Sequence, residues 1–261
     1  MALVTFERDE KGMTATAKAR IDALLVERGL VQSRERARAL ILAGRVLVNE
    51  QKIDKPGASV ASDAAVRLLG EDLRYVSRGG LKLEAALETW KIDMAGRACL
   101  DVGASTGGFT DCLLQHGAAQ VTAIDTGFGQ IAMKLRNDPR VHLMERTNAR
   151  LLEPNSLAGE PALLVMDVSF ISVTLVLPAV LAAAPSLREA VILVKPQFEA
   201  GREYVGKGGI VRDPEAHQLA IERVADCVRE EGGEVAAVID SPITGMEGNK
   251  EFLLHAKFKT G

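Results

Sequence analysis

The sequence predicts an α/β fold: a small N-terminal module of helices and short strands, then a larger domain on a mostly parallel sheet with helices on both faces. Three observations predict it. Apolar segments alternate with helical patterns after residue 75, which is typical of a parallel sheet. Polar residues stand at the ends of four of these segments, at Asp101, Asp125, Asp167 and Lys195, where such sheets bind ligands. Positive charge is concentrated in the N-terminal module.

Charge separates the two modules. Residues 18–60 carry nine Lys or Arg and five Asp or Glu, a net charge of +4, whereas residues 77–261 carry 19 and 24, a net charge of −5. A basic small module joined to an acidic larger one predicts that the first part contacts phosphate. Residues 1–17 show no periodicity, and we expect them to form a flexible N-terminal arm.

Cysteine spacing and the N-terminus indicate a cytoplasmic protein. Cys99, Cys112 and Cys227 form no C-x-x-C pair, so we expect buried reduced thiols and no metal. No signal peptide is predicted, because no positively charged start precedes an apolar core. The apolar stretch 162–185 contains Asp167, which costs roughly 2.5–3.5 kcal/mol on membrane-insertion scales. We therefore expect a buried strand and a core-facing helix there, and no membrane contact.

The small module starts with two helical patterns. Residues 20–30 place apolar side chains at helical spacing. Ser33 is a good N-cap for the next helix, which places Arg34 and Arg38 on one face. A hairpin with its turn at Asn49-Glu50 follows.

A glycine-rich loop stands in the segment Cys99-Leu-Asp-Val-Gly-Ala-Ser-Thr-Gly-Gly-Phe-Thr110, between an apolar strand and the start of a helix. This arrangement lets the backbone approach a nucleotide-like ligand. Gly103, Gly107 and Gly108 fit neither the G-x-G-x-x-G spacing nor a P-loop, so an ordinary turn is the alternative. Asp125, at the end of the next strand, is placed to hold ribose hydroxyls.

The other elements of the large domain follow from the same alternation. Helices are expected from Phe109 and after Asp213, which is an N-cap with Pro214 at the first helical position. Residues 198–210 contain four glycines and are predicted to form a mobile loop, either a lid over substrate or an ordinary exposed loop. The candidate strands are residues 98–102, 121–125, 141–144, 163–167, 191–195, 235–240 and 252–258.

The basic module resembles the S4 RNA-binding domain over roughly residues 19–75. The matching residues are Arg20-Ile-Asp-x-Leu-Leu25, Ser33-Arg-x-x-Ala37 and Ile41-x-x-Gly44-x-Val46-x-Val48-Asn49. The alternative is that its arginines form a solvated helix face. The resemblance implies a domain at residues 18–75 that binds structured RNA, mainly by shape and phosphate contacts. Its implied contact residues are Arg20, Arg34, Arg38, Arg45 and Lys52.

The chain from about residue 18 onward resembles the TlyA family, which joins an S4 domain to an FtsJ/RrmJ-like rRNA methyltransferase and is also named hemolysin. The motifs that carry the resemblance are Ser77-Arg-Gly-Gly-x-Lys82-Leu83, Asp101-Val-Gly-x-Ser-x-Gly-Gly-Phe-Thr110, Glu145-Arg-Thr-Asn148, Met166-Asp-Val-Ser-Phe-Ile-Ser172, Val194-Lys-Pro-Gln-Phe-Glu199, Gly208-Gly-Ile-Val-Arg212 and Gly248-Asn-Lys-Glu251. It implies that residues 76–261 form a seven-stranded, Rossmann-like methyltransferase domain. The implied reaction is methyl transfer from S-adenosylmethionine to a cytidine ribose 2′-oxygen of ribosomal RNA. The resemblance favours the large subunit as substrate and leaves the small subunit open as a further one.

The same resemblance implies a site for S-adenosylmethionine. Asp101 would lie near the amino group of the cofactor, and Asp125 would accept hydrogen bonds from its ribose hydroxyls. Thr147 and Asn148 would lie near the adenine, the alternative being that they form only a turn. The residues implied around the methionine and ribose parts are Gly103, Ser105, Gly107, Gly108 and Phe109.

The resemblance also implies a catalytic set, which maps onto Lys82, Asp167, Lys195 and Glu251. A ribose 2′-hydroxyl is a poor nucleophile until its proton is removed or polarised. Lys195 is the candidate base; burial, a second ammonium and the sulfonium of the cofactor would favour its neutral form. Lys82 would supply that like charge and orient the ribose, and Asp167 would hold Lys195. Glu251 would accept hydrogen bonds from the hydroxyl or a lysine. Taken singly, Lys82 could be a surface helix residue and Glu251 a strand-edge residue.

Two other classes of function compete with this enzyme. A ribosome-binding or assembly factor without catalysis could keep the fold, although it would have no need of the two lysines and two acids. A membrane-lytic protein would need a spanning segment or a long basic amphipathic helix, and the sequence offers neither. The expected partners are ribosomal RNA and ribosomal subunits.

Overall fold

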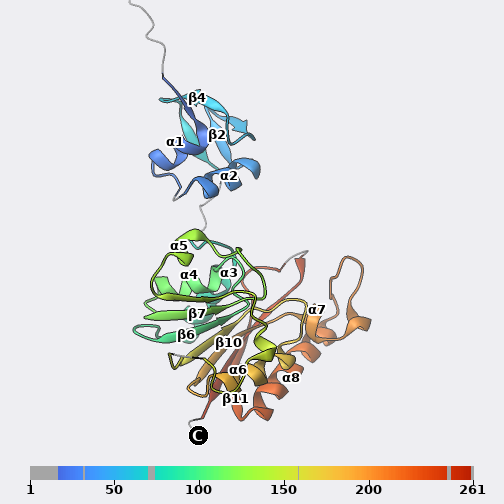
Figure 1. Cartoon of the computed structure of the whole chain (residues 1–261). Helices are drawn as coiled ribbons and strands as arrows, with labels where there is room; N and C mark the ends of the chain where they lie inside the picture. Colours follow the sequence, from blue (N-terminus) through green and yellow to red (C-terminus); the bar gives the residue numbers. More distant parts are fainter. Residues whose placement is uncertain (1–16, 32, 70–73, 158, 246–247, 260–261) are drawn as a thin grey trace, which may run out of the picture. The chain divides into compact units, whose positions relative to one another are not determined.

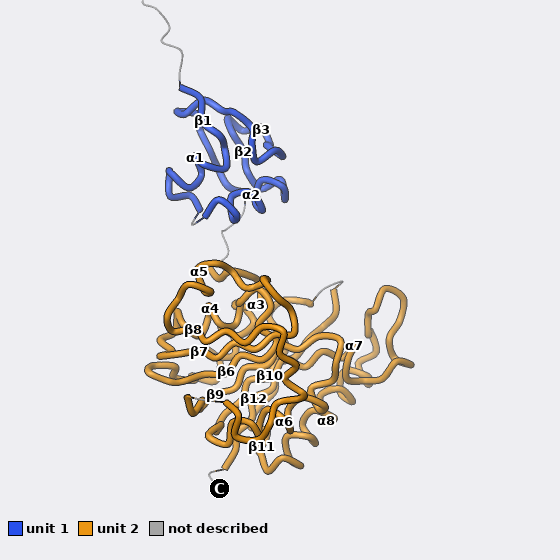
Figure 2. Tube along the Cα trace, in the orientation of Figure 1, with its two compact units in different colours: residues 1–72 blue, residues 73–261 orange. Residues whose placement is uncertain are grey.

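The computed structural model describes residues 17–31, 33–69, 74–157, 159–245 and 248–259. The chain divides into two compact units, Met1–Asp72 and Leu73–Gly261 (Figures 1 and 2). The division falls slightly earlier than predicted, because Tyr75 is buried in the core of the large unit and packs against Gly80. The predicted N-terminal arm lies outside the described residues except for Ala17.

The small unit packs two helices against short antiparallel strands. The strand order in its three-stranded sheet is β3-β2-β5, and β1 pairs with β4. Ser33 caps the second helix as predicted, since its hydroxyl accepts a hydrogen bond from the backbone of Arg36. Asn49 and Glu50 both have positive φ, as a tight hairpin turn requires. The elements are β1 (Lys18–Arg20), α1 (Ile21–Glu27), α2 (Arg34–Leu42), β2 (Val46–Val48), β3 (Gln51–Ile53), β4 (Ser59–Ala61) and β5 (Val66–Leu68).

The large unit is built on the predicted seven-stranded sheet, in the order β11-β12-β10-β9-β6-β7-β8. Strand β12 is antiparallel to both of its neighbours, and the other pairs are parallel. The seven strands fall where the apolar segments predicted them, with ends shifted by a few residues at most. They are β6 (Ala98–Val102), β7 (Gln120–Ile124), β8 (Val141–Met144), β9 (Leu163–Met166), β10 (Glu189–Val194), β11 (Gly233–Asp240) and β12 (Phe252–Phe258).

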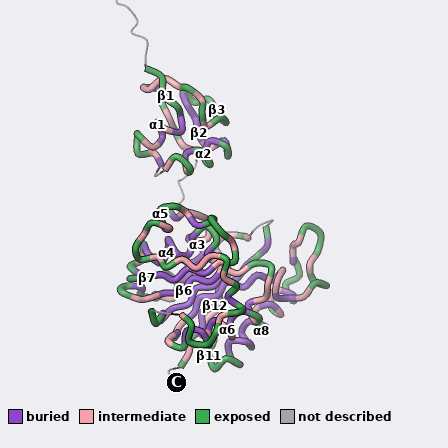
Figure 3. Tube along the Cα trace, viewed as in Figure 1, coloured by how far each residue is buried: buried purple, intermediate pink, exposed green. Residues whose placement is uncertain are grey.

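Helices cover both faces of this sheet, and alternate residues of the central strands face two different cores. In β9, Leu163 and Val165 pack with the residues of α3 and α4, whereas Leu164 and Met166 pack with those of α6 and α8. The central strands are accordingly buried (Figure 3). The helices are α3 (Gly79–Trp90), α4 (Gly108–Gln115), α5 (Met133–Arg136), α6 (Leu177–Ala183), α7 (Pro196–Glu199) and α8 (Pro214–Glu230), with 3-10 turns η1 (Ala149–Leu151), η2 (Val173–Leu175) and η3 (Arg202–Tyr204).

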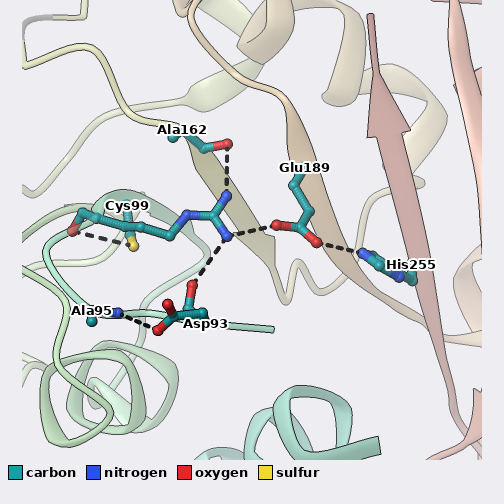
Figure 4. Close-up of polar contacts among 7 residues, drawn as sticks. Asp93, Ala95, Cys99, Ala162, Glu189 and His255 are labelled. Carbon is teal, nitrogen blue, oxygen red and sulfur yellow. Dashed lines mark hydrogen bonds and ion pairs between the residues drawn. The ribbon is translucent and has the colours of Figure 1, made fainter. Parts of the chain in front are cut away.

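A polar network ties three strands together in the half of the sheet where the parallel strands begin (Figure 4). Glu189, the first residue of β10, accepts a hydrogen bond from the Arg97 guanidinium at 2.6 Å and pairs with Nε2 of His255 on β12 at 2.7 Å. The His255 ring stacks on Trp90 with 4.9 Å between ring centroids. The hydrogen bonds from His255 and Arg97 hold the pKa of Glu189 down to about 2.

The secondary structure of two segments differs in detail from the prediction. The stretch 162–185 contains strand β9 and then helix α6, as expected, but the helix begins only at Leu177. The predicted loop 198–210 begins inside α7 and contains η3, so part of it is helical. Among the described residues, no helix combines the length and apolar character needed to cross a membrane.

Candidate active site

The carboxyl ends of the strands bring distant polar residues to one edge of the sheet. Asp125, Asp167 and Lys195 directly follow β7, β9 and β10. Glu251 reaches the same edge from the other direction, because it directly precedes the antiparallel strand β12, whose first residue Phe252 pairs with Val194 at the end of β10. The topology therefore gathers side chains from four strands.

The two lysines and two acids predicted as a catalytic set form two ion pairs. Nζ of Lys82, on helix α3, donates to Oε2 of Glu251 at 2.5 Å. Nζ of Lys195 lies 2.5 Å from Oδ1 of Asp167. Lys82, Lys195 and Glu251 are buried, and Asp167 is partly exposed. The burial of Lys82 and Glu251 therefore excludes the alternative that either is an ordinary surface residue.

One member of each ion pair lines the same cavity. This cavity, called here the lysine cavity, has a volume of about 280 Å³ and is lined by Lys82 and Asp167 together with the N-terminal part of α3 and the glycine-rich loop. A second cavity of about 480 Å³, the Asp125 cavity, is lined by Asp125, Thr147 and Asn148. Gly103, Ser105 and Asp167 line both cavities, so the two adjoin at the glycine-rich loop.

The glycine-rich loop passes close to the backbone that follows strand β9. A Cβ on Gly103 would lie 2.4 Å from the carbonyl oxygen of Asp167, and its φ is +88°, so only glycine fits there. Asp125 is fixed from the same loop, because its Oδ2 accepts a hydrogen bond from the Ser105 amide at 2.8 Å. Its Oδ1 accepts one from the Gly127 amide at 2.6 Å. Each carboxylate oxygen retains a further acceptor position.

The other predicted cofactor residues divide into two groups. Gly108 and Phe109 line the lysine cavity. Gly107 and Asp101 line neither cavity. Gly107 has a φ of +92°, and a Cβ there would meet the side chain of Leu135 at 2.2 Å, so the need for glycine comes from core packing. Gly107 therefore has a structural role, and its contact with a ligand stays a prediction.

Asp101 is enclosed below the loop. Its Oδ2 accepts a hydrogen bond from the Thr110 hydroxyl at 2.6 Å, and its Oδ1 is buried without a hydrogen-bond partner among the described residues. Burial, reinforced by the neighbouring carboxylates of Asp167 and Asp125, raises the pKa of Asp101 to about 7. An ammonium group of a ligand would satisfy the free oxygen.

Thr147 and Asn148 form the turn that was their alternative interpretation. The Asn148 side chain accepts a hydrogen bond from the amide of Arg150 and caps η1. The Thr147 hydroxyl donates to the carbonyl of Glu145 at 3.1 Å. Both residues also line the Asp125 cavity.

Some residues of the site had no assigned role in the sequence. Ser169 accepts a hydrogen bond from Nζ of Lys195 at 2.8 Å, and Thr110 holds Asp101. Gly245 packs against the Glu251 carboxylate, which a Cβ would approach to 2.1 Å. A signal existed for Ser169, because it stands two residues after Asp167 in a motif that carries the family resemblance. Gly245 offered none, since its role depends on a tertiary contact.

In the small unit, the five cationic residues predicted to bind RNA have different surroundings. Arg20 and Arg34 both pair with the buried Asp22, at 2.9 and 3.0 Å, and these contacts hold the pKa of Asp22 well below its usual range. Nε of Arg45 donates to the carbonyl of Leu69. Arg38 and Lys52 are exposed and make no ion pair with any described residue.

Comparison with known proteins assigns both units. Residues 75–258 match the FtsJ-like methyltransferase family, and residues 19–66 match the S4 domain. A Mycobacterium tuberculosis protein named 16S/23S rRNA (cytidine-2′-O)-methyltransferase TlyA is 47% identical over 244 residues, which cover 93% of this chain and 91% of the relative. The chain belongs to the TlyA family.

Two further similarities agree with this assignment. YqxC of Bacillus subtilis, described as an rRNA methyltransferase, is 50% identical over 239 residues, 91% of this chain and 85% of its own. A solved structure from Streptococcus thermophilus, described as a hemolysin, is 44% identical with a TM-score of 0.71 and covers 94% of this chain and 90% of its own. The large unit is thus an FtsJ-like methyltransferase domain whose methyl donor is S-adenosylmethionine.

The residues present fit that donor. The Asp125 carboxylate offers free acceptor positions in a cavity of about 480 Å³, which Gly103 and Ser105 also line. The partnerless Oδ1 of Asp101 would suit an amino group. No group of three or more His, Cys, Asp or Glu side chains is placed to hold a metal in the part of the chain that the structure describes.

Proposed function

We propose that this chain methylates the ribose 2′-oxygen of a cytidine in ribosomal RNA. The observation that carries the proposal is that Lys82 and Asp167, one member of each ion pair, line a cavity that adjoins the Asp125 cavity. Their partners Glu251 and Lys195 line neither cavity and lie directly behind them. The activity named for the Mycobacterium tuberculosis relative supports the same reaction and substrate. A ribosomal RNA substrate makes ribosomal subunits the partners and the cytoplasm the place of the reaction.

In this proposal the Asp125 cavity binds the methyl donor and the lysine cavity binds the target ribose. S-adenosylmethionine, when bound, supplies a methyl group on a positively charged sulfur. Asp125 would hold the ribose hydroxyls of the donor, with Thr147 and Asn148 near its adenine, and Gly103 and Ser105 would line its path. The target ribose would enter the adjoining lysine cavity.

Lys195 is proposed to take the proton of the 2′-hydroxyl. In its neutral form the amine would accept this proton as the new oxygen–carbon bond forms and the carbon–sulfur bond breaks. Asp167 and Ser169 fix the nitrogen from two directions, so that the amine is held in place before the hydroxyl arrives. Positioning of this kind contributes much of the rate in methyl transfer, which needs oxygen, carbon and sulfur in line.

Lys82 and Glu251 are proposed to orient the target ribose. Lys82 faces the lysine cavity and can donate to a ribose oxygen while Glu251 holds its ammonium. The charges of Lys82 and Glu251 cancel within this buried pair. An uncharged ribose can therefore bind beside it without facing a large net charge. In the small unit, Arg20, Arg34, Arg38, Arg45 and Lys52 are proposed to contact the RNA backbone.

The decisive experiment incubates the full chain with isotopically labelled S-adenosylmethionine and each purified ribosomal subunit, then locates the labelled nucleotides by mass spectrometry. We expect label on the ribose of a cytidine. Lys195→Ala should lower the rate by roughly 10²–10⁴-fold, the usual contribution of a general base, with RNA binding kept. Lys257→Ala, an exposed lysine at the opposite end of β12, is the matched control.

Three results would contradict the proposal. Label on a base rather than a ribose would exclude 2′-oxygen chemistry. Full activity of Lys195→Ala would exclude the proposed base. Binding to a subunit without any transfer by the unmodified protein would favour the ribosome-binding factor.

A further inference from the structure

Two short segments of the active site are joined at both of their ends. Residues 167–173 follow strand β9, and residues 195–199 follow strand β10. At the first end, Nζ of Lys195 contacts Oδ1 of Asp167 at 2.5 Å and Oγ of Ser169 at 2.8 Å. This end forms part of the proposed catalytic set.

Glu199 makes the second connection, four residues further along. Its Oε2 accepts a hydrogen bond from the Ser172 hydroxyl at 2.5 Å, and its Oε1 accepts one from the Val173 amide at 2.8 Å. Val173 is the first residue of η2, so the Glu199 carboxylate also caps the N-terminal end of this 3-10 turn. Glu199 is only 5% exposed and its contact with the Val173 amide is buried, whereas Ser172 is partly exposed.

An aromatic contact lies between the two connections. The rings of Phe170 and Phe198 are 5.4 Å apart and tilted by 52°. Phe170 has a φ of +65°, a backbone conformation that side-chain-bearing residues adopt only when their surroundings impose it. The two segments therefore contact each other at three successive levels, the middle one through a Phe170 side chain that is 90% exposed.

Glu199 itself lines neither the lysine cavity nor the Asp125 cavity. It lies at the end of α7, four residues after Lys195, and its backbone carbonyl accepts a hydrogen bond from Arg223 of α8. The residue is thus tied to the helical layer and to the loop, but it does not face the proposed substrate. Its influence on the reaction must pass through the segments that it joins.

We propose that Glu199 is a positioning residue for methyl transfer, which fixes Asp167 and Ser169 against Lys195 by clamping the far end of their loop. The inference rests on the proposed function of Lys195. Without the clamp, residues 167–173 would keep one connection to 195–199 and gain conformational freedom there. A displacement of about 1 Å at a reacting group costs roughly 10²-fold in rate.

The test compares three variants of the full chain in the ribosomal-subunit assay. Glu199→Ala removes both acceptors, and we expect kcat to fall roughly 10- to 100-fold while KM for the subunit stays within about twofold. Glu199→Gln should retain most of the rate, because its carbonyl can accept from the Val173 amide and its amide can donate to the Ser172 oxygen. Ser172→Ala should also lower kcat, but it additionally removes the cap that the Ser172 hydroxyl gives η2 through the Thr174 amide, so the comparison of Glu199→Ala with Glu199→Gln is the decisive one.

The control is Glu203→Ala, an exposed carboxylate on η3 outside both segments, which should leave kcat unchanged. Thermal unfolding of each variant reports whether the fold is kept. The inference is overturned if Glu199→Ala keeps the full rate, or if Glu199→Gln is as slow as Glu199→Ala. If instead the unmodified protein labels no ribose, the proposed function itself fails, and the two failures are thereby distinguished.

Discussion

At the scale of single residues, Asp101 carries the clearest electrostatic strain in the site. It is completely buried, only one of its oxygens has a hydrogen-bond partner among the described residues, and its pKa is raised to about 7. In the unfolded chain the same carboxyl group has a pKa near 3.9. The folded state therefore binds the proton more tightly, and stability is lost as pH rises from about 4 to about 7.

Replacing Asp101 with Asn should remove this loss. Without cofactor, we expect Asp101→Asn to be more stable than the unmodified protein at pH 8, by up to about 4 kcal/mol for a shift of three pKa units, and no more stable at pH 4. Urea unfolding at the two pH values measures the difference. Asp63→Asn, which changes an exposed carboxylate, serves as the control. Parallel stability curves for Asp101→Asn and the unmodified protein would show that the buried carboxylate is not the cause.

At the scale of elements, the network around Glu189 joins β10 to β12 and to the residue before β6. The folded pKa of Glu189, about 2, lies below its unfolded value near 4.3, so the network stabilises the fold above pH 4.3 and loses this contribution as pH falls towards 2. We expect Glu189→Gln to lower the unfolding free energy by about 2–3 kcal/mol at pH 7, and by much less near pH 2.5.

Fluorescence of Trp90, the single tryptophan of the chain, can follow this unfolding, because its ring stacks on His255 within the same network. Glu234→Gln, an exposed carboxylate on β11, is the control. A loss of stability that is equal at both pH values would mean that packing, and not the charge of Glu189, is responsible.

Strand ends are the part of this site that sequence predicts best. A polar residue directly after a buried apolar strand is visible in the sequence, and Asp125, Asp167 and Lys195 were all found in this way. Glu251 needed the family resemblance, because its place at the same edge depends on β12 being antiparallel. The partnership of Glu199 with Ser172 gave no signal, since it joins residues 27 positions apart across two loops.

At the scale of the whole molecule, the two units carry complementary parts of the proposed function. Residues 18–60 of the small unit carry a net charge of +4 and residues 77–261 a net charge of −5, so attraction to RNA phosphates is assigned to the small unit, whereas the cavities that would hold the donor and the target ribose belong to the large unit. Within the small unit, Asp22 offsets part of the charge of Arg20 and Arg34. Arg38 and Lys52 keep their full charge exposed, which makes them the cleanest probes of phosphate binding.

The double variant Arg38→Ala/Lys52→Ala should weaken binding to ribosomal subunits without changing the binding of S-adenosylmethionine. Each lost phosphate contact should reduce the slope of log K against log salt concentration by roughly 0.7–0.9, so two contacts reduce it by about 1.4–1.8. Subunit binding measured at several salt concentrations gives the slope, and calorimetry gives the cofactor affinity. Lys257→Ala removes an exposed positive charge from the large unit and should leave the slope unchanged. An unchanged slope in the double variant would place the RNA contacts elsewhere on the chain, whereas a loss of cofactor affinity would mean that the two units are coupled.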